Sequence, residues 1–119
     1  MIRRKEEITV RNVEHAQGGK ETVTFTDFLL PQDVPGHGRV ISKLIIPPGA
    51  SIGYHTHEGE FEALYVLEGE AAVNDNGEEF TLHPGDMHIC RNGNGHGTEN
   101  RSNRALVMIA LILNDLSDK

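Results

Sequence analysis

The histidines of this sequence are concentrated in two stretches and are not spread evenly along the chain. His55 and His57 have the period-two spacing that places both imidazoles on one face of a β-strand. Glu62 follows five residues after His57, in the next apolar run. Two imidazoles and a carboxylate that meet at one point form a facial donor set for a divalent transition metal. The His-x-His pair alone is a weak signal, because such pairs also occur on surface strands without a metal.

Two longer motifs surround these residues. From Gly49 to Gly69 the chain reads Gly-x5-His-x-His-x4-Glu-x6-Gly, which matches the first motif of the cupin superfamily at every position. A counterpart of the second cupin motif starts at Gly85, and its spacing is kept by the residues Gly93, His96 and Asn100. It departs from the family only at Arg91, where the motif has proline. That proline shapes a turn and binds no metal, so the departure leaves the ligand positions intact and only the loop before His96 in doubt.

The sequence therefore resembles the cupins over residues 39–113, and the resemblance implies the fold and the metal site. The fold is then all-β, a single-domain cupin double-stranded β-helix, also called a jelly-roll barrel. The four ligand positions of the family fall on His55, His57, Glu62 and His96. Three neutral imidazoles and one carboxylate suit Mn, Fe, Co, Ni, Cu or Zn, and they suit Ca or Mg poorly. We expect one divalent transition metal, with Mn or Fe favoured and Ni, Co, Cu or Zn as alternatives.

The function that the resemblance implies is less specific than the site. The chain is similar to small single-domain cupins described as oxalate-decarboxylase-like, which implies a metal-dependent enzyme acting on a small organic acid by decarboxylation or oxygenation. Its expected partner is a small carboxylate or oxygenated ligand. Cupins host many chemistries, so a non-catalytic ligand-binding module and, with less support, a sugar isomerase are alternatives. No catalytic residue and no organic cofactor is predicted.

The elements that must position these residues are short strands separated by Gly, Pro, Asn and Asp. We predict strands at residues 21–29, 39–46, 61–73, 79–82, 87–91 and 105–113. Asn76-Gly77 between two strand-like runs is a strong hairpin signal. Residues 6–17 could hold a short helix that Gly18 and Gly19 would end. We expect one domain overall, with an N-terminal segment at 1–38 that packs a strand on a cupin barrel at 39–119.

Several side chains near the motifs have open or secondary roles. The odd positions of the strand 87–91 are apolar and are favoured as core, but the other parity would place His88 and Cys90 in the pocket. Cys90 is interpreted as a small buried hydrophobe and not as a nucleophile. The surface histidines are expected to be His15, His37 and His83, and the surface carboxylates Glu58 and Glu60. Arg39 and Arg91 are candidate cations for an anionic substrate.

Charge and hydropathy exclude several partners. The chain of 119 residues has 11 basic and 18 acidic residues and a formal charge of −7, which disfavours nucleic acid and anionic membranes. Its single cysteine and the lack of an N-terminal signal or membrane-length apolar run favour a cytoplasmic protein. Residues 106–113 are apolar at every position, so both faces of that strand should be covered. We therefore predict a homodimer.

Overall fold

The computed structural model describes residues 1–117 of the chain, which form two antiparallel sheets. The larger sheet has six strands in the order β1 (Thr9–Glu14), β2 (Thr22–Leu29), β3 (Gly38–Ile46), β10 (Leu106–Asn114), β5 (Glu60–Glu68) and β8 (Met87–Cys90). The smaller sheet has four strands in the order β4 (Ser51–Thr56), β9 (Gly95–Glu99), β6 (Ala71–Asp75) and β7 (Glu78–Leu82). Three short 3-10 turns complete the secondary structure of these residues: η1 (Lys5–Glu7), η2 (Ala16–Gly18) and η3 (Pro31–Asp33).

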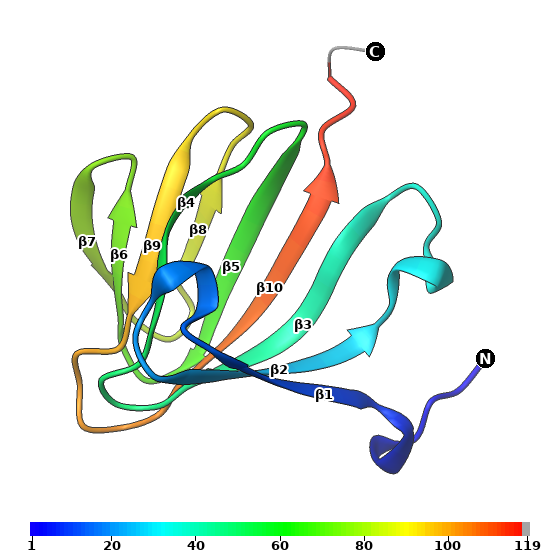
Figure 1. Cartoon of the computed structure of the whole chain (residues 1–119), viewed down its shortest axis with the longest axis horizontal. Coiled ribbons are helices and arrows are strands. Elements are labelled where there is room, and N and C mark those ends of the chain that lie inside the picture. The colour runs from blue at the N-terminus through cyan, green and yellow to red at the C-terminus, as the bar shows by residue number, and fades with distance from the viewer. Residues whose placement is uncertain (118–119) are drawn as a thin grey trace.

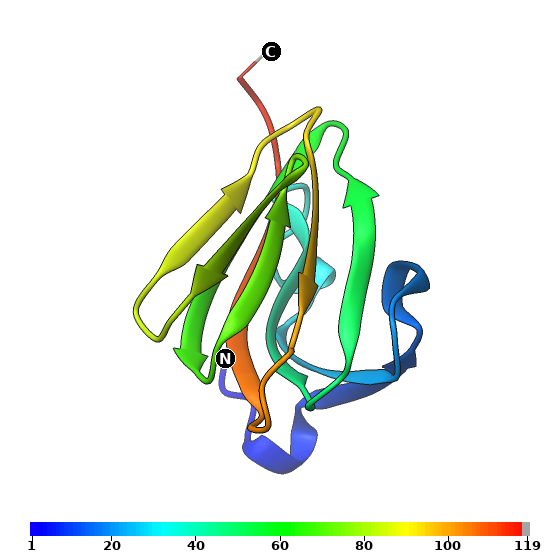
Figure 2. The same ribbon diagram turned by 90° about the vertical axis from the view of Figure 1, so that its left-hand side faces the viewer.

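The two sheets curve around one interior, as the two perpendicular views show (Figure 1, Figure 2). This arrangement confirms the predicted all-β jelly-roll fold. The strand predicted in the N-terminal segment is β2, which lies between β1 and β3 in the larger sheet. None of the helical turns within residues 1–117 is long and apolar enough to cross a membrane.

The predicted helix over residues 6–17 is wrong, because most of this segment is β1 followed by the turn η2. β1 contains the β-branched residues Thr9, Val10 and Val13, which favour extended backbone. It also pairs with β2 over its whole length, with Val13 opposite Val23. Pairing with β2 therefore determines the secondary structure of this segment. A prediction from the local sequence alone could not take this pairing into account.

The predicted strand 61–73 is two strands, and Gly69 separates them. Gly69 has a φ of 84°, and a Cβ built there would lie 2.5 Å from the carbonyl oxygen of Ala105. Only glycine allows this backbone conformation and this close approach together. The chain can therefore leave β5 in the larger sheet and enter β6 in the smaller one.

The interior has an apolar part and a polar part along the same strands. On β5 the inward side chains are Glu62, Leu64 and Val66, and all three are buried. Leu64 and Val66 belong to the apolar core, whose largest fully buried side chains include Leu44, Ile46, Leu106 and Met108. Glu62 lies beyond this core, beside the histidines. The apolar core and the polar site therefore occupy different positions along the same strands.

Candidate metal centre

Three strands from the two sheets bring the four predicted ligands together. His55 on β4 and His96 on β9 are register partners in the smaller sheet, and His57 follows directly after β4. Glu62 approaches them from β5 in the larger sheet. One donor atom from each of these side chains lies within 4.8 Å of all the others. The structure thus gathers in one cluster the residues that the motif spacing selected.

The separations between the donor atoms fit a single small cation. His57 Nε2 lies 3.1 Å from His55 Nε2, from His96 Nε2 and from Glu62 Oε1. Glu62 Oε1 lies 2.7 Å from His96 Nε2 and 3.7 Å from His55 Nε2. A metal–nitrogen bond of about 2.1 Å places neighbouring donors of an octahedron about 3.0 Å apart. Most of the observed separations are close to that edge.

The far nitrogens of two of these imidazoles are bound to acceptors, which fixes their tautomers. His55 Nδ1 donates to the carbonyl oxygen of Gly53 at 2.8 Å, since a carbonyl can only accept. His57 Nδ1 donates to the Glu60 carboxylate at 2.6 Å. Each Nε2 is then left with a lone pair directed at the cluster. A carbonyl or carboxylate behind a histidine is the usual arrangement behind metal-binding imidazoles.

His96 is held by His88, whose Nε2 lies 3.2 Å from His96 Nδ1. His88 and Cys90 are buried, whereas Met87 is 57% exposed, so the parity favoured for this strand was wrong. The apolar odd residues of β8 face outward and the even residues face the site. Burial raises the pKa of the Cys90 thiol to about 11, so it stays protonated at neutral pH, which agrees with its interpretation as a buried hydrophobe.

Glu60 is not the simple surface charge that was predicted. Gly59 has a φ of 73°, which breaks the strand alternation after β4 and turns Glu60 back toward His57. Arg39 binds the same carboxylate through Nε and Nη2, each at 2.8 Å. These hydrogen bonds, led by that of Arg39, lower the pKa of Glu60 although partial burial opposes them. Glu60 thus links the Arg39 guanidinium to a ligand imidazole.

The remaining residues with predicted secondary roles lie outside the site. Glu58 and Arg91 are exposed, and Arg91 belongs to a separate surface depression with Phe61 and Ile89. The prediction of surface histidines is confirmed for His15, His37 and His83. Of the two candidate cations, only Arg39 reaches the cavity beside the cluster.

The electrostatics of the cluster favour a bound cation. Burial of Glu62 works against ionisation, but the close imidazoles of His55, His57 and His96 outweigh it and hold the pKa of Glu62 well below its ordinary value. The short contact with the Glu62 carboxylate is also the largest cause of the raised pKa of His57. A buried carboxylate surrounded by three imidazole lone pairs is costly unless a positive charge balances it. A divalent transition metal supplies that charge and suits these donors, so the residues fit the predicted ion.

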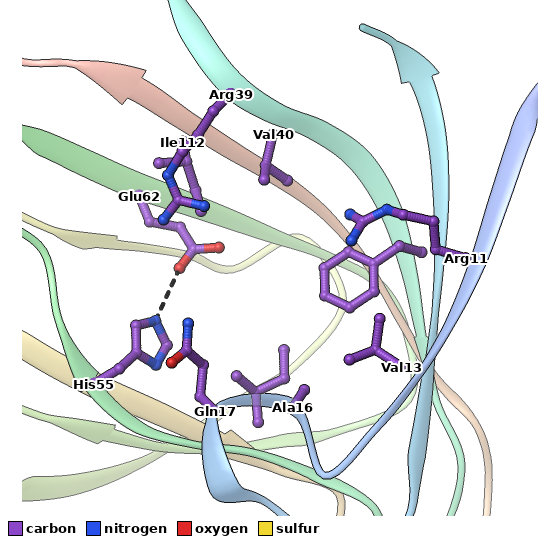
Figure 3. A pocket seen from close by; sticks show the side chains of 11 residues that line it. Arg11, Val13, Ala16, Gln17, Arg39, Val40, His55, Glu62 and Ile112 are labelled. Atoms are coloured by element: carbon purple, nitrogen blue, oxygen red, sulfur yellow. Dashed lines mark ion pairs between the residues drawn. The ribbon is translucent and has the colours of Figure 1, made fainter. Parts of the chain in front are cut away.

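A cavity of about 170 Å³ opens beside the cluster. Figure 3 shows His55, Glu62 and Arg39 at one end and Arg11 and Val13 at the other, with Gln17 among the lining side chains. Four lining residues belong to β1 and η2, and Phe25 belongs to β2. Sequence reasoning missed these N-terminal residues because they lie outside both motifs. The alternation of polar and apolar side chains in residues 21–29 predicted a strand, but it did not indicate which residues the inner face of that strand would contact.

A comparison with protein-family models matches residues 42–112 to the cupin domain. The chain belongs to the cupin family. A curated relative, the oxalate-binding protein of Thermotoga maritima, is 35% identical over 113 residues, which cover 95% of this chain and 93% of that protein. The tetracenomycin polyketide synthase protein TcmJ of Streptomyces glaucescens is 32% identical over 89 residues, which cover 75% of this chain and 57% of TcmJ.

Among solved structures, that of a predicted oxalate decarboxylase from Thermotoga maritima superposes on this cupin with a TM-score of 0.90. The two sequences are 35% identical, and the match covers 97% of this chain and 100% of the other. The alignment therefore includes β1, η2 and β2 as well as the cupin barrel. The likeness confirms the resemblance to oxalate-decarboxylase-like cupins and the single-domain architecture.

Proposed function

We propose that this cupin binds one divalent transition metal, Mn or Fe in preference, through His55, His57, Glu62 and His96. The observation that carries the proposal is the convergence of three Nε2 atoms and one carboxylate oxygen within 4.8 Å. The hydrogen bonds at the Nδ1 atoms support it, because they leave the Nε2 lone pairs free for an ion. A donor set of this kind suits the later first-row metals as well, so Ni, Co, Cu and Zn remain alternatives.

We further propose that the site acts on a small organic acid, by oxygenation or decarboxylation. A bound Mn or Fe ion supplies Lewis acidity and one-electron chemistry to a carboxylate. A six-coordinate ion with four protein ligands has two positions left, which suit a chelating acid. The Gln17 amide, which lines the same cavity as His55, can donate a hydrogen bond to an oxygen of the acid (Figure 3). The name of the Thermotoga maritima relative, an oxalate-binding protein, is consistent with this ligand class.

A non-catalytic binding module is the second candidate, and the lining of the cavity favours it in one respect. Apart from the proposed ligands His55 and Glu62, the described lining residues include no histidine, carboxylate, cysteine or tyrosine that could transfer a proton. A reaction that needs a general acid would therefore lack one here. Sugar phosphate isomerisation has less support, because both arginines of the cavity are already bound to carboxylates.

We also propose that two copies associate through the outer face of the larger sheet. Met87, Tyr65 and Ile109 lie in register across β8, β5 and β10 on that face. Met87 is 57% exposed and Tyr65 is 47% exposed, and Leu67 on the same strand as Tyr65 is exposed as well. A contiguous exposed apolar patch is typical of a surface that binds another protein. A second copy with the same patch would cover both.

Elemental analysis of protein purified without a chelator tests the metal site. The proposal expects about one equivalent of Mn or Fe per chain, and a chain that holds no transition metal contradicts it. Oxygen uptake and carbon dioxide release are then measured with oxalate and with 2-oxo acids. Turnover of any of these supports the enzyme, whereas tight binding without turnover establishes the binding module instead.

A further inference from the structure

The cavity beside the metal centre has an apolar end that the N-terminal segment builds. Val13 on β1 and Phe25 on β2 line it together with Ile52 of β4. Val13, Phe25 and Ile52 pack against the hydrophobic core and are only partly buried, so each offers apolar surface to a ligand. A ligand bound at the cluster through one end would place its other end against these three side chains.

The turn η2 keeps this apolar end at a fixed distance from the cluster. Gly53 on β4 and Gly19 after η2 allow the two backbones to touch, since a Cβ built at Gly53 would lie 2.2 Å from the carbonyl oxygen of Gln17. A Cβ at Gly19 would lie 2.2 Å from the carbonyl oxygen of Ser51. The N-terminal segment is therefore joined closely to the strand that carries His55.

Both cations at the cavity already have carboxylate partners. Arg11 binds Asp27 through Nε at 2.5 Å and Nη2 at 3.1 Å, and it also stacks over Phe25 at 4.5 Å from the ring centroid. Arg39 binds Glu60 through two nitrogens. A second carboxylate at the far end of a ligand would therefore meet apolar side chains and paired arginines. Desolvating such a charge beside guanidinium groups whose charge is already balanced is unfavourable.

We propose that the preferred ligand is a monocarboxylate 2-oxo acid with a branched apolar tail, in preference to oxalate or an acid with a second carboxylate. The inference rests on the proposed function, because the carboxylate end of the ligand binds at the metal. A cavity of about 150 Å³ is large enough for a benzene ring, and the cavity here is about 170 Å³. The apolar tail of such a ligand then fills the part of the cavity that the smaller oxalate would leave empty.

Calorimetric titration of the full-length protein loaded with Mn(II) tests the inference without relying on turnover. The acids are oxalate, pyruvate, α-ketoisocaproate and α-ketoglutarate, the last two being of similar length with an apolar and a charged tail. We expect α-ketoisocaproate to bind roughly 10- to 50-fold more tightly than pyruvate, because its extra methylene and methyl groups become buried. It should also bind more tightly than α-ketoglutarate and oxalate.

A pair of variants locates the effect. Val13→Asn should remove most of the advantage of α-ketoisocaproate over pyruvate and leave pyruvate affinity within about twofold. Val10→Asn is the matched control, because Val10 lies on the same strand with its side chain 57% exposed and outside the cavity. Equal or tighter binding of oxalate, pyruvate or α-ketoglutarate by the unmodified protein would overturn the inference and leave the proposed function standing. Failure of all four acids to bind would overturn both.

Discussion

His88 Nε2 lies 3.2 Å from Nδ1 of His96, and both imidazoles are buried. Because His96 Nε2 faces the cluster, the ring proton of His96 is on Nδ1. This N–H donates a hydrogen bond to Nε2 of His88. Burial lowers the pKa of His88, which favours the neutral form that such an acceptor requires. His88 is therefore a positioning residue that orients a ligand and does not itself contact the ion.

This role predicts a difference between two His88 variants. His88→Leu leaves the His96 N–H without a partner in a buried site, so the affinity for Mn(II) should fall about 10- to 100-fold. His88→Gln keeps an acceptor oxygen and should retain most of the affinity. Competition with a chelator measures both, with His83→Leu as a control on an exposed histidine. Equal affinities of the Leu variant and the unmodified protein would show that His96 needs no support.

His57→Ala should abolish metal-dependent stabilisation while the fold is kept. His57 Nε2 contacts all three other donor atoms, but the apolar core lies elsewhere along the strands. For the unmodified protein, a metal concentration of about one hundred times Kd stabilises the fold by about 2.7 kcal/mol. Thermal unfolding with and without Mn(II) checks this, and His37→Ala serves as the control. A metal-induced rise in Tm that survives His57→Ala would contradict the assigned ligands.

Gly53→Ala should reduce both stability and metal affinity. The added methyl group meets the backbone of Gln17, which cannot move aside as a flexible side chain could. Overpacking of this kind costs about 1–3 kcal/mol. The carbonyl oxygen of Gly53 also accepts from His55, so a shift of β4 would turn this imidazole. Urea unfolding and Mn(II) titration measure the two effects, and Thr56→Ala on the exposed side of the same strand should leave both near normal.

Asp27 makes stability depend on pH in the acidic range. Burial of Asp27 opposes its ionisation, but hydrogen bonds from Arg11 and Ser42 outweigh that effect and lower the pKa of Asp27 below its ordinary value. The folded state therefore releases the proton more readily than the unfolded state, whose carboxyl has a pKa of about 3.9. The stabilisation is complete above that value and is lost as the pH falls through the lower folded pKa.

Asp27→Asn should consequently destabilise the protein at pH 7 and have a smaller effect near pH 3. Urea unfolding at both pH values gives the comparison, with Glu78→Gln on β7 as an exposed control. An Asp27→Asn effect that is the same at both pH values would show that the ion pair with Arg11 contributes nothing to the acid response.

The ligands could be predicted from the sequence because they stand at the fixed spacings of two family motifs. His55 and His57 need only an extended backbone to share a face, and the two motifs add Glu62 and His96 at defined distances. The contacts behind the ligands could not be predicted in the same way. Glu60 reaches His57 only because the chain turns at Gly59, and His88 faces inward although its neighbours on β8 are the more apolar residues.

The N-terminal half of the cavity was beyond local reasoning for a different reason. Val13 and Phe25 line it because β1 and β2 extend the larger sheet and η2 folds back onto β4. These are contacts between segments far apart in the sequence, and no spacing rule within residues 1–38 encodes them. The outer face of β10 also depends on contacts that the local sequence does not specify. The apolar run 106–113 predicted that both faces of the strand are covered. Within one chain, only the inward face is fully buried.

This outer face gives the last prediction. If two copies cover it, light scattering at micromolar concentration should give twice the chain mass of 13.1 kDa. Tyr65→Glu, in the middle of the row from Met87 to Ile109, should place two like charges near one another and yield a monomer. Phe80→Glu is the matched control, because Phe80 is an aromatic residue of similar exposure, 49%, on β7 of the other sheet. It should leave the dimer intact. A monomeric mass for the unmodified protein would rule out this interface. Dissociation by Phe80→Glu but not by Tyr65→Glu would show that the interface is on the smaller sheet instead.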